Sequence, residues 1–212
     1  MTTNVQEARG RVRARPTRRR ARGLNVYPAK EAPFDPDDGG VPPAMWVDEP
    51  GVDGWVRWKP VPGAVGAEHI ARIEARVDAP LPALVRAYLE DACIGPIESR
   101  GVRLPAIWSD APLRDVEVAL DQWSPLERAG YLAIAEDAAD AGPLCLDLRG
   151  RRADGDCPVV LFDAEKLAAL GPSGCADRAV VGPLAELRFE SFAKLLDHLE
   201  RTMGEGSLRP PA

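Results

Sequence analysis

Hydrophobic residues recur at helical spacing in the first half of the chain. Residues 67–77 place aliphatic side chains on one face and charged side chains elsewhere, which predicts an amphipathic helix. A second helix is predicted to begin after Leu81-Pro82, because proline is tolerated in a first turn, and to end at Gly95-Pro96. A weaker helical pattern covers about residues 111–122, with Leu113, Val116 and Leu120 inward.

The pattern then changes to short apolar runs bounded by Gly, Asp and Pro, which are typical of strands. These runs are residues 131–135, 144–148 and 158–163, and a further short strand is predicted at residues 179–181. The loop at residues 150–156 is expected to join the second and third runs as a hairpin.

The last hydrophobic stripe predicts a closing helix at about residues 192–203, with Ser191 as its N-cap. Lys194 stands where a capping box would have Glu, so only half of that motif is present. Helices first, strands in the middle and a helix last predict a single α+β domain. We expect a mostly antiparallel, twisted sheet of about five or six strands flanked by helices.

The sequence outside this domain has a different composition. Residues 1–23 form an Arg-rich leader with too few large apolar groups to offset the entropy of ordering, so disorder is expected. Residues 24–54 contain six prolines and predict a linker or a wrapping arm, which Trp46 and Trp55 could attach to the domain. The domain itself is expected at residues 55–203, followed by a disordered tail at 204–212.

Charge is distributed unevenly between these parts. Residues 1–22 hold eight arginines and one acidic residue, a net charge of +7, whereas residues 23–212 carry -13. Clustered arginines can bind the phosphates of nucleic acid, but no aromatic residue is interleaved for base stacking. A solvated leader or a misassigned start codon is the alternative that we favour, and no other part of the chain is expected to bind nucleic acid.

The cysteines indicate a reducing compartment. Cys93, Cys145, Cys157 and Cys175 match no zinc-ligand spacing, and a chain of this length and apolar content does not need a disulfide framework. Centring the 150–156 turn near Ala153 pairs Cys145 with about Leu161 and leaves Cys157 opposite Arg149, which disfavours a bridge between these two cysteines. No apolar run approaches the roughly 18 residues of a membrane span, so a cytoplasmic protein is expected.

Candidate catalytic and metal-binding groups are sparse. His69 and His198 lack a second ligand at helical spacing, and Ser173 in residues 171–174 lacks the strand, sharp turn and helix of a nucleophile elbow, so we interpret it as a loop residue. Four carboxylates near strand ends could bind cations or transfer protons, although structural roles are the favoured interpretation: Asp137, Asp140, Asp147 and Asp163. No catalytic residue, metal or cofactor is expected.

Taken in order, several short motifs resemble those of the SUKH superfamily, the Smi/Knr-like proteins. They are Trp58-Lys59-Pro60, Ile70 with Ile73-Glu74, Leu81-Pro82 with Tyr88-Leu89, residues 131–137, 144–148 and 158–163, and Ser191-Phe192 with Leu195-Leu196. The likeness covers about residues 55–200. Two positions depart from it: residues 92–95 replace a Gly-rich turn, and Ala164 stands where His is frequent.

The resemblance implies an α+β fold and a non-catalytic protein-binding module. For most bacterial members it implies an immunity protein that binds and neutralises a cognate toxin, frequently a nuclease. A regulatory scaffold that binds an endogenous protein is the alternative, because fungal relatives act in signalling. The negative charge of residues 23–212 suits a basic partner, although it can also serve solubility alone. The candidate partner-binding residues are Asp110, Asp115, Glu117 and Asp121.

Overall fold

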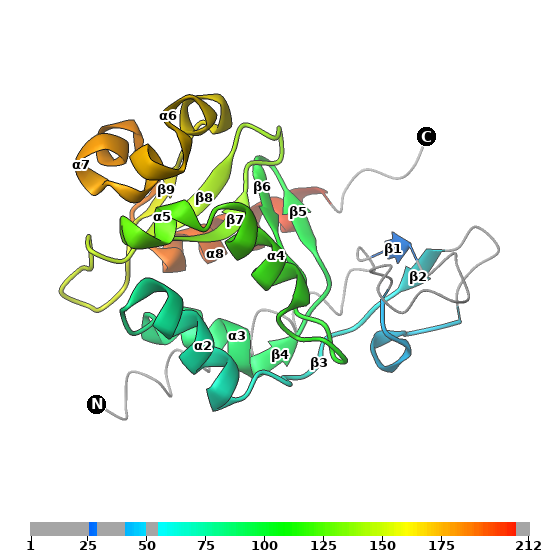
Figure 1. The fold of residues 1–212 in the computed structure, drawn as a ribbon. Helices are drawn as coiled ribbons and strands as arrows, with labels where there is room; N and C mark the ends of the chain where they lie inside the picture. Colours follow the sequence, from blue (N-terminus) through cyan, green and yellow to red (C-terminus); the bar gives the residue numbers. More distant parts are fainter. Residues whose placement is uncertain (1–25, 29–40, 50–54, 207–212) are drawn as a thin grey trace.

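A computed structural model describes residues 26–28, 41–49 and 55–206 of this chain, which form helices packed on a curled antiparallel sheet (Figure 1). The helical elements in chain order are η1 (Pro43–Met45), α2 (Ala67–Val77), α3 (Ala83–Asp91), α4 (Arg114–Gln122), α5 (Pro125–Arg128), α6 (Ala164–Ala176), α7 (Arg178–Val181), η2 (Gly182–Leu184) and α8 (Phe192–Gly206). The strands are β1 (Val26–Pro28), β2 (Trp55–Arg57), β3 (Val61–Pro62), β4 (Ala92–Cys93), β5 (Ile97–Ser99), β6 (Val102–Leu104), β7 (Tyr131–Glu136), β8 (Pro143–Asp147), β9 (Val159–Leu161) and β10 (Glu186–Phe189).

The central sheet has six strands in the order β10-β9-β8-β7-β6-β5, and every neighbouring pair is antiparallel. This confirms the predicted α+β class with an antiparallel sheet. Two small sheets, β1-β2 and β3-β4, complete the strand pairing of the described residues. No helix of this described part is long and apolar enough to cross a membrane.

Both faces of the sheet are buried, which explains why the predicted strands are continuous apolar runs. Alternate side chains such as Leu144 and Leu146 enter the larger core, to which α2, α3, α4 and α8 contribute. Their neighbours, such as Cys145, enter a second core beneath α5, α6 and α7. A strand covered on both faces loses the polar alternation of a half-exposed strand.

Three predicted helices can be compared with the structure at their boundaries. The helix predicted at residues 67–77 is α2, and Ile70, Ile73 and Val77 are buried as expected. The second predicted helix ends at Asp91 rather than at Gly95-Pro96, because residues 92–93 pair with β3. The closing helix α8 begins after Ser191, whose Oγ accepts a hydrogen bond from the Lys194 amide at 3.2 Å.

The prediction for residues 179–181 is wrong, because this segment is the helix α7. Asp177 caps it by accepting a hydrogen bond from the Ala179 amide at 2.9 Å, and this local bond favours a helical turn over a strand. The next strand along the chain is β10. Sequence patterns missed it because three of its four side chains are exposed and show no alternation.

Two further interpretations need correction. Ser173 does not lie in a loop: helical turns continue on both sides of Gly171, which breaks α6 with a φ of 66°, a conformation that glycine adopts readily. In the hairpin of β8 and β9, Cys145 pairs with Val160 and not with Leu161, so the register differs by one residue from the prediction. All four cysteines are free, as the disfavoured bridge implied.

Part of the proline-rich segment contacts the domain. Trp46 forms a bridge with Trp58, and its indole nitrogen donates to the Val41 carbonyl at 2.7 Å. Val41 and Met45 are buried in the main core. The predicted leader at 1–23 lies outside the described residues, as does the side chain of Trp55. Of the tail predicted at 204–212, residues 204–206 belong to the helix α8, and residues 207–212 lie outside the described residues.

Candidate functional site

The predicted partner-binding residues lie together on and just before α4. Asp110 is exposed in the preceding loop, and Asp115, Glu117 and Asp121 follow on the helix. Asp115 has a clear structural role, because one of its oxygens accepts a hydrogen bond from the indole nitrogen of the fully buried Trp108 at 2.9 Å. Its carboxylate thereby satisfies a buried polar group.

Two arginines of α2 pair with the other two acids of α4. Arg72 donates to Glu117 at 2.8 Å, and Arg76 donates to Asp121 at 2.7 Å. Arg76 also binds Glu127 of α5 at 2.8 Å, so a single guanidinium joins three helices. Burial opposes the charge of Arg76, but its hydrogen bonds to Glu127 and Asp121 outweigh burial and raise its pKa.

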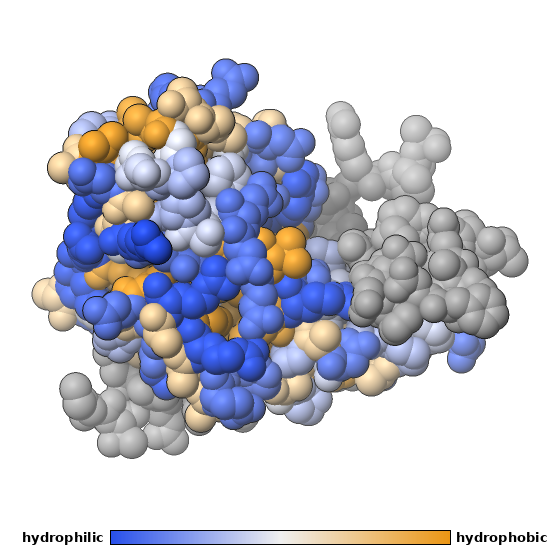
Figure 2. Space-filling view, in the orientation of Figure 1, coloured by the Kyte–Doolittle hydropathy of each residue, from blue (hydrophilic) through white to orange (hydrophobic). Residues whose placement is uncertain are grey.

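These pairs leave a mixed surface facing solvent. Val118 is 62% exposed, and it stands on the same helix as Glu117 and Asp121, whose side chain is 73% exposed. Asp110 is exposed just before this helix. We call Asp110, Glu117, Val118 and Asp121 the α4 surface. Figure 2 shows that the face of the molecule with α2 and α4 is largely hydrophilic, whereas hydrophobic residues gather over α6 and α7.

Val118 and the role of the two arginines were not predicted from the sequence. Arg72 and Arg76 are four residues apart, as are Glu117 and Asp121. Side chains at this spacing lie on one face of a helix, so two such pairs of opposite charge can align when two helices pack together. The matching spacing was therefore a usable signal, but the packing of α2 near α4 was needed to recognise it.

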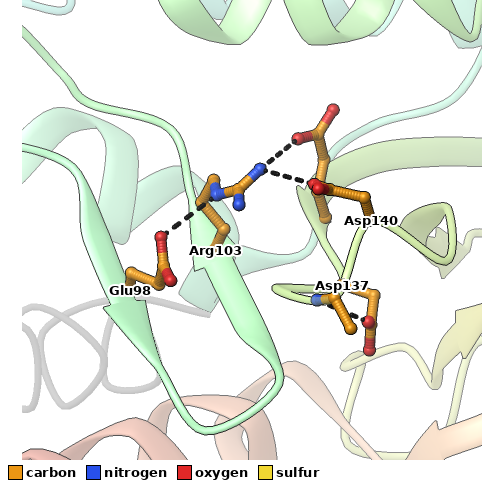
Figure 3. A network of polar contacts seen from close by, with 6 residues as sticks. Glu98, Arg103, Asp137 and Asp140 are labelled. Atoms are coloured by element: carbon orange, nitrogen blue, oxygen red, sulfur yellow. Dashed lines mark hydrogen bonds and ion pairs between the residues drawn. The ribbon is translucent and has the colours of Figure 1, made fainter.

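The carboxylates near strand ends do not gather into one site. Figure 3 shows Asp140 and Glu98 bound to Arg103, at 3.0 and 3.3 Å respectively. These two hydrogen bonds raise the pKa of the Arg103 guanidinium. Asp137 instead accepts a hydrogen bond from the Ala139 amide at 2.9 Å and lies 3.6 Å from Arg188. Each of these acids therefore has a cationic or amide partner.

Asp147 and Asp163 have separate structural roles. Asp147 accepts two hydrogen bonds from Arg178, both at 2.8 Å, and this guanidinium lies over the ring of Tyr131 at 4.5 Å. Asp163 caps α6 by accepting a hydrogen bond from the Lys166 amide at 2.9 Å. Among the residues that the structure describes, no group of three His, Cys, Asp or Glu residues is placed to hold a metal ion.

The remaining candidate groups also support the fold. His69 accepts a hydrogen bond from the Gly66 amide at 3.0 Å, at the start of α2, and a ring nitrogen of His198 lies 3.2 Å from the Arg100 carbonyl. Burial raises the pKa of all four thiols, to about 11 for Cys157. The reactive thiolate form is therefore disfavoured at neutral pH.

The sequence matches no protein-family model, and no curated protein is significantly similar to it. Membership of the SUKH superfamily therefore stays a prediction that depends on the ordered motifs.

Proposed function

We propose that this chain is a non-catalytic binding module that neutralises a cognate bacterial toxin by direct contact, as an immunity protein does. The observation that carries the proposal is the α4 surface, where the exposed Val118 stands among carboxylates. An apolar side chain surrounded by charged groups can supply a desolvated centre and a polar rim, the two parts of a specific protein interface.

Ion pairing prepares this surface for binding. Arg72 holds Glu117 and Arg76 holds Asp121, so these acids lose little conformational freedom when a partner binds. The exposed Asp110 and Asp121, together with the net charge of -13 over residues 23–212, favour encounter with a basic protein. A basic nuclease domain fits this chemistry.

Two further observations support binding over catalysis. The thiols are buried in their protonated form, and the acids considered for catalysis cap helices or pair with arginines. The order of the elements, from α2 and α3 through the antiparallel sheet to α8, agrees with the fold that the family resemblance implies.

The proposal is tested with toxins encoded beside this gene, by co-expression rescue and by calorimetric titration of the purified pair. Asp110→Lys combined with Val118→Lys replaces one carboxylate and the apolar centre of the α4 surface by two cations, without breaking the bonds of Arg72 or Arg76. We expect affinity to fall at least about 100-fold, as is typical of the loss of a hot spot.

The matched control is Glu165→Lys combined with Ala168→Lys, which makes equivalent changes at two exposed positions of α6. This control should bind like the unmodified chain. Failure to rescue cells from every neighbouring toxin would overturn the immunity role, and capture of a defined endogenous regulator in its place would favour the scaffold alternative. Equal binding by both double variants would exclude the α4 surface as the contact.

A further inference from the structure

Most arginines of the domain lie beside a carboxylate, as expected where acidic residues are in excess. Arg76 with Glu127 and Arg178 with Asp147 are examples, both at 2.8 Å. Three exposed arginines form no ion pair within the part of the chain that the structure describes: Arg128, Arg149 and Arg151. Residues 23–212 carry a net charge of -13, so a shortage of carboxylates does not explain these unpaired cations.

The three arginines are neighbours at one end of the central sheet. Arg149 and Arg151 flank Gly150 in the loop between β8 and β9, which projects past α5 (Figure 1). Arg128 is the last residue of α5, and Nη2 of Arg149 donates to its carbonyl at 3.2 Å. Arg151 reaches the linker between α2 and α3, where it donates to the Pro80 carbonyl. We call Arg128, Arg149 and Arg151 the arginine surface.

Backbone carbonyls hold two of these cations without neutralising them. A carbonyl oxygen carries only a partial charge, whereas a carboxylate cancels the charge of its arginine. A guanidinium has five N–H donors, so the carbonyl bonds of Arg149 and Arg151 leave others for a ligand. Arg149 also lies against Gly130, where its Nε is 2.8 Å from the position that a Cβ would take. Side chains held in this way lose less conformational freedom when an anion binds.

The acids of the same region have other partners. Asp147 accepts both hydrogen bonds of Arg178, and Asp154 lies 3.6 Å from Arg152. Asp156, the remaining acid of the loop, accepts hydrogen bonds from two amides at the start of α8. The positive charges of the arginine surface therefore have no ion-pair partner among these acids and face solvent.

We infer that the arginine surface is a docking site for an acidic protein segment, whose carboxylates it binds. The planar fork of a guanidinium matches a carboxylate, and such charge-assisted hydrogen bonds are stronger than neutral ones. Nucleic acid is a poorer fit, because the net charge of -13 repels a phosphate backbone and the nearby Tyr131 is buried, where it cannot stack on a base. The arginine surface shares no residue with the α4 surface, so the two are tested separately.

The test is an NMR titration of the ¹⁵N-labelled full-length chain with octaglutamate. We expect saturable amide shifts at residues 128–130 and 149–151, with a dissociation constant at or below about 1 mM that rises with salt. The shifts are measured residue by residue, so peptide that binds the Arg-rich leader is distinguished from peptide bound at the arginine surface. An uncharged Gly-Ser octapeptide should cause no shift. Absence of saturable shifts at these residues overturns the inference.

Variants identify the cations responsible. Arg128→Gln combined with Arg149→Gln should weaken octaglutamate binding at these residues at least about tenfold, with unchanged shifts elsewhere showing that the variant is folded. Arg201→Gln is the matched control: Arg201 is exposed on α8 beside His198, which contacts the β5–β6 turn at the opposite end of β7. This control should bind like the unmodified chain. Equal binding by both variants overturns the inference.

A nucleic acid of matched charge tests the class of partner. A single-stranded oligothymidine of nine nucleotides carries eight phosphates, as many charges as octaglutamate has carboxylate side chains. We expect it to bind more weakly than octaglutamate at residues 128–130 and 149–151. Tighter binding by the oligonucleotide at these residues would assign the arginine surface to a phosphate backbone and overturn the inference.

Discussion

Arg76 offers a direct test of how burial determines the strength of an ion pair, because it binds two carboxylates in different environments. Its partner Glu127 has a side chain only 10% exposed, whereas the Asp121 side chain is 73% exposed. The two N–O distances are nearly equal, at 2.8 and 2.7 Å. Geometry alone would therefore assign similar energies to the two pairs, and solvent screening should separate them.

The expected magnitudes differ several-fold. Hydrogen bonds to charged groups contribute about 1.5–3 kcal/mol when the pair is shielded from water, and leaving one partner buried without the other costs more. Exposed pairs contribute about 0.2–1 kcal/mol because water and salt screen them. We therefore expect Arg76→Met to lower the free energy of unfolding by about 3 kcal/mol, mostly through the loss of the bond to Glu127.

Double-mutant cycles separate the two contributions. Urea unfolding of Arg76→Met, Glu127→Gln, Asp121→Asn and the two corresponding double variants yields a coupling energy for each pair. We expect about 2 kcal/mol for Arg76 with Glu127 and less than about 1 kcal/mol for Arg76 with Asp121. Arg72→Met is the control, because its bond to Glu117 is exposed and its loss should cost less than about 1 kcal/mol. Equal couplings, or a larger one with Asp121, would refute the reasoning from burial.

Three further predictions concern stability and charge. Asp156 accepts hydrogen bonds from the amides of Phe192 and Ala193 at 3.2 and 3.0 Å, so Asp156→Ala should cost about 1–2 kcal/mol in urea unfolding, whereas Lys194→Ala on the exposed side of α8 should be nearly neutral. The buried Cys157 thiol is protonated in the folded and unfolded states below pH 9, so it makes stability independent of pH there. Because burial raises its pKa to about 11 in the folded state, the free energy of unfolding should fall by about 1.4 kcal/mol per pH unit between pH 9 and 11, and Cys157→Ala should show a flatter pH dependence of unfolding under reducing conditions. Deleting residues 1–22 removes a net charge of +7, and fluorescence anisotropy should then detect no salt-sensitive binding to duplex DNA; binding that survives the deletion would contradict the expectation that no part of the chain outside the leader binds nucleic acid.

Local sequence signals determined the elements that carry their own pattern. The helix at residues 67–77 and the strands at 131–135 and 144–148 are long, strongly apolar segments, and hydrophobic burial favours the same structure that their periodicity indicates. Ser191 likewise marked the start of α8, since a helix cap acts over only a few residues. The α+β class followed from the order of these elements.

Tertiary contacts decided what short or exposed segments do. Strand β10 has no alternating pattern and exists because β9 supplies its hydrogen bonds, while residues 179–181 became helical once Asp177 capped them. The α4 surface depends on contacts between residues 45 positions apart, as in Arg76 with Asp121. A sequence shows that both groups are charged, but only the packing of α2 near α4 brings them within 2.7 Å and determines which carboxylates still face solvent.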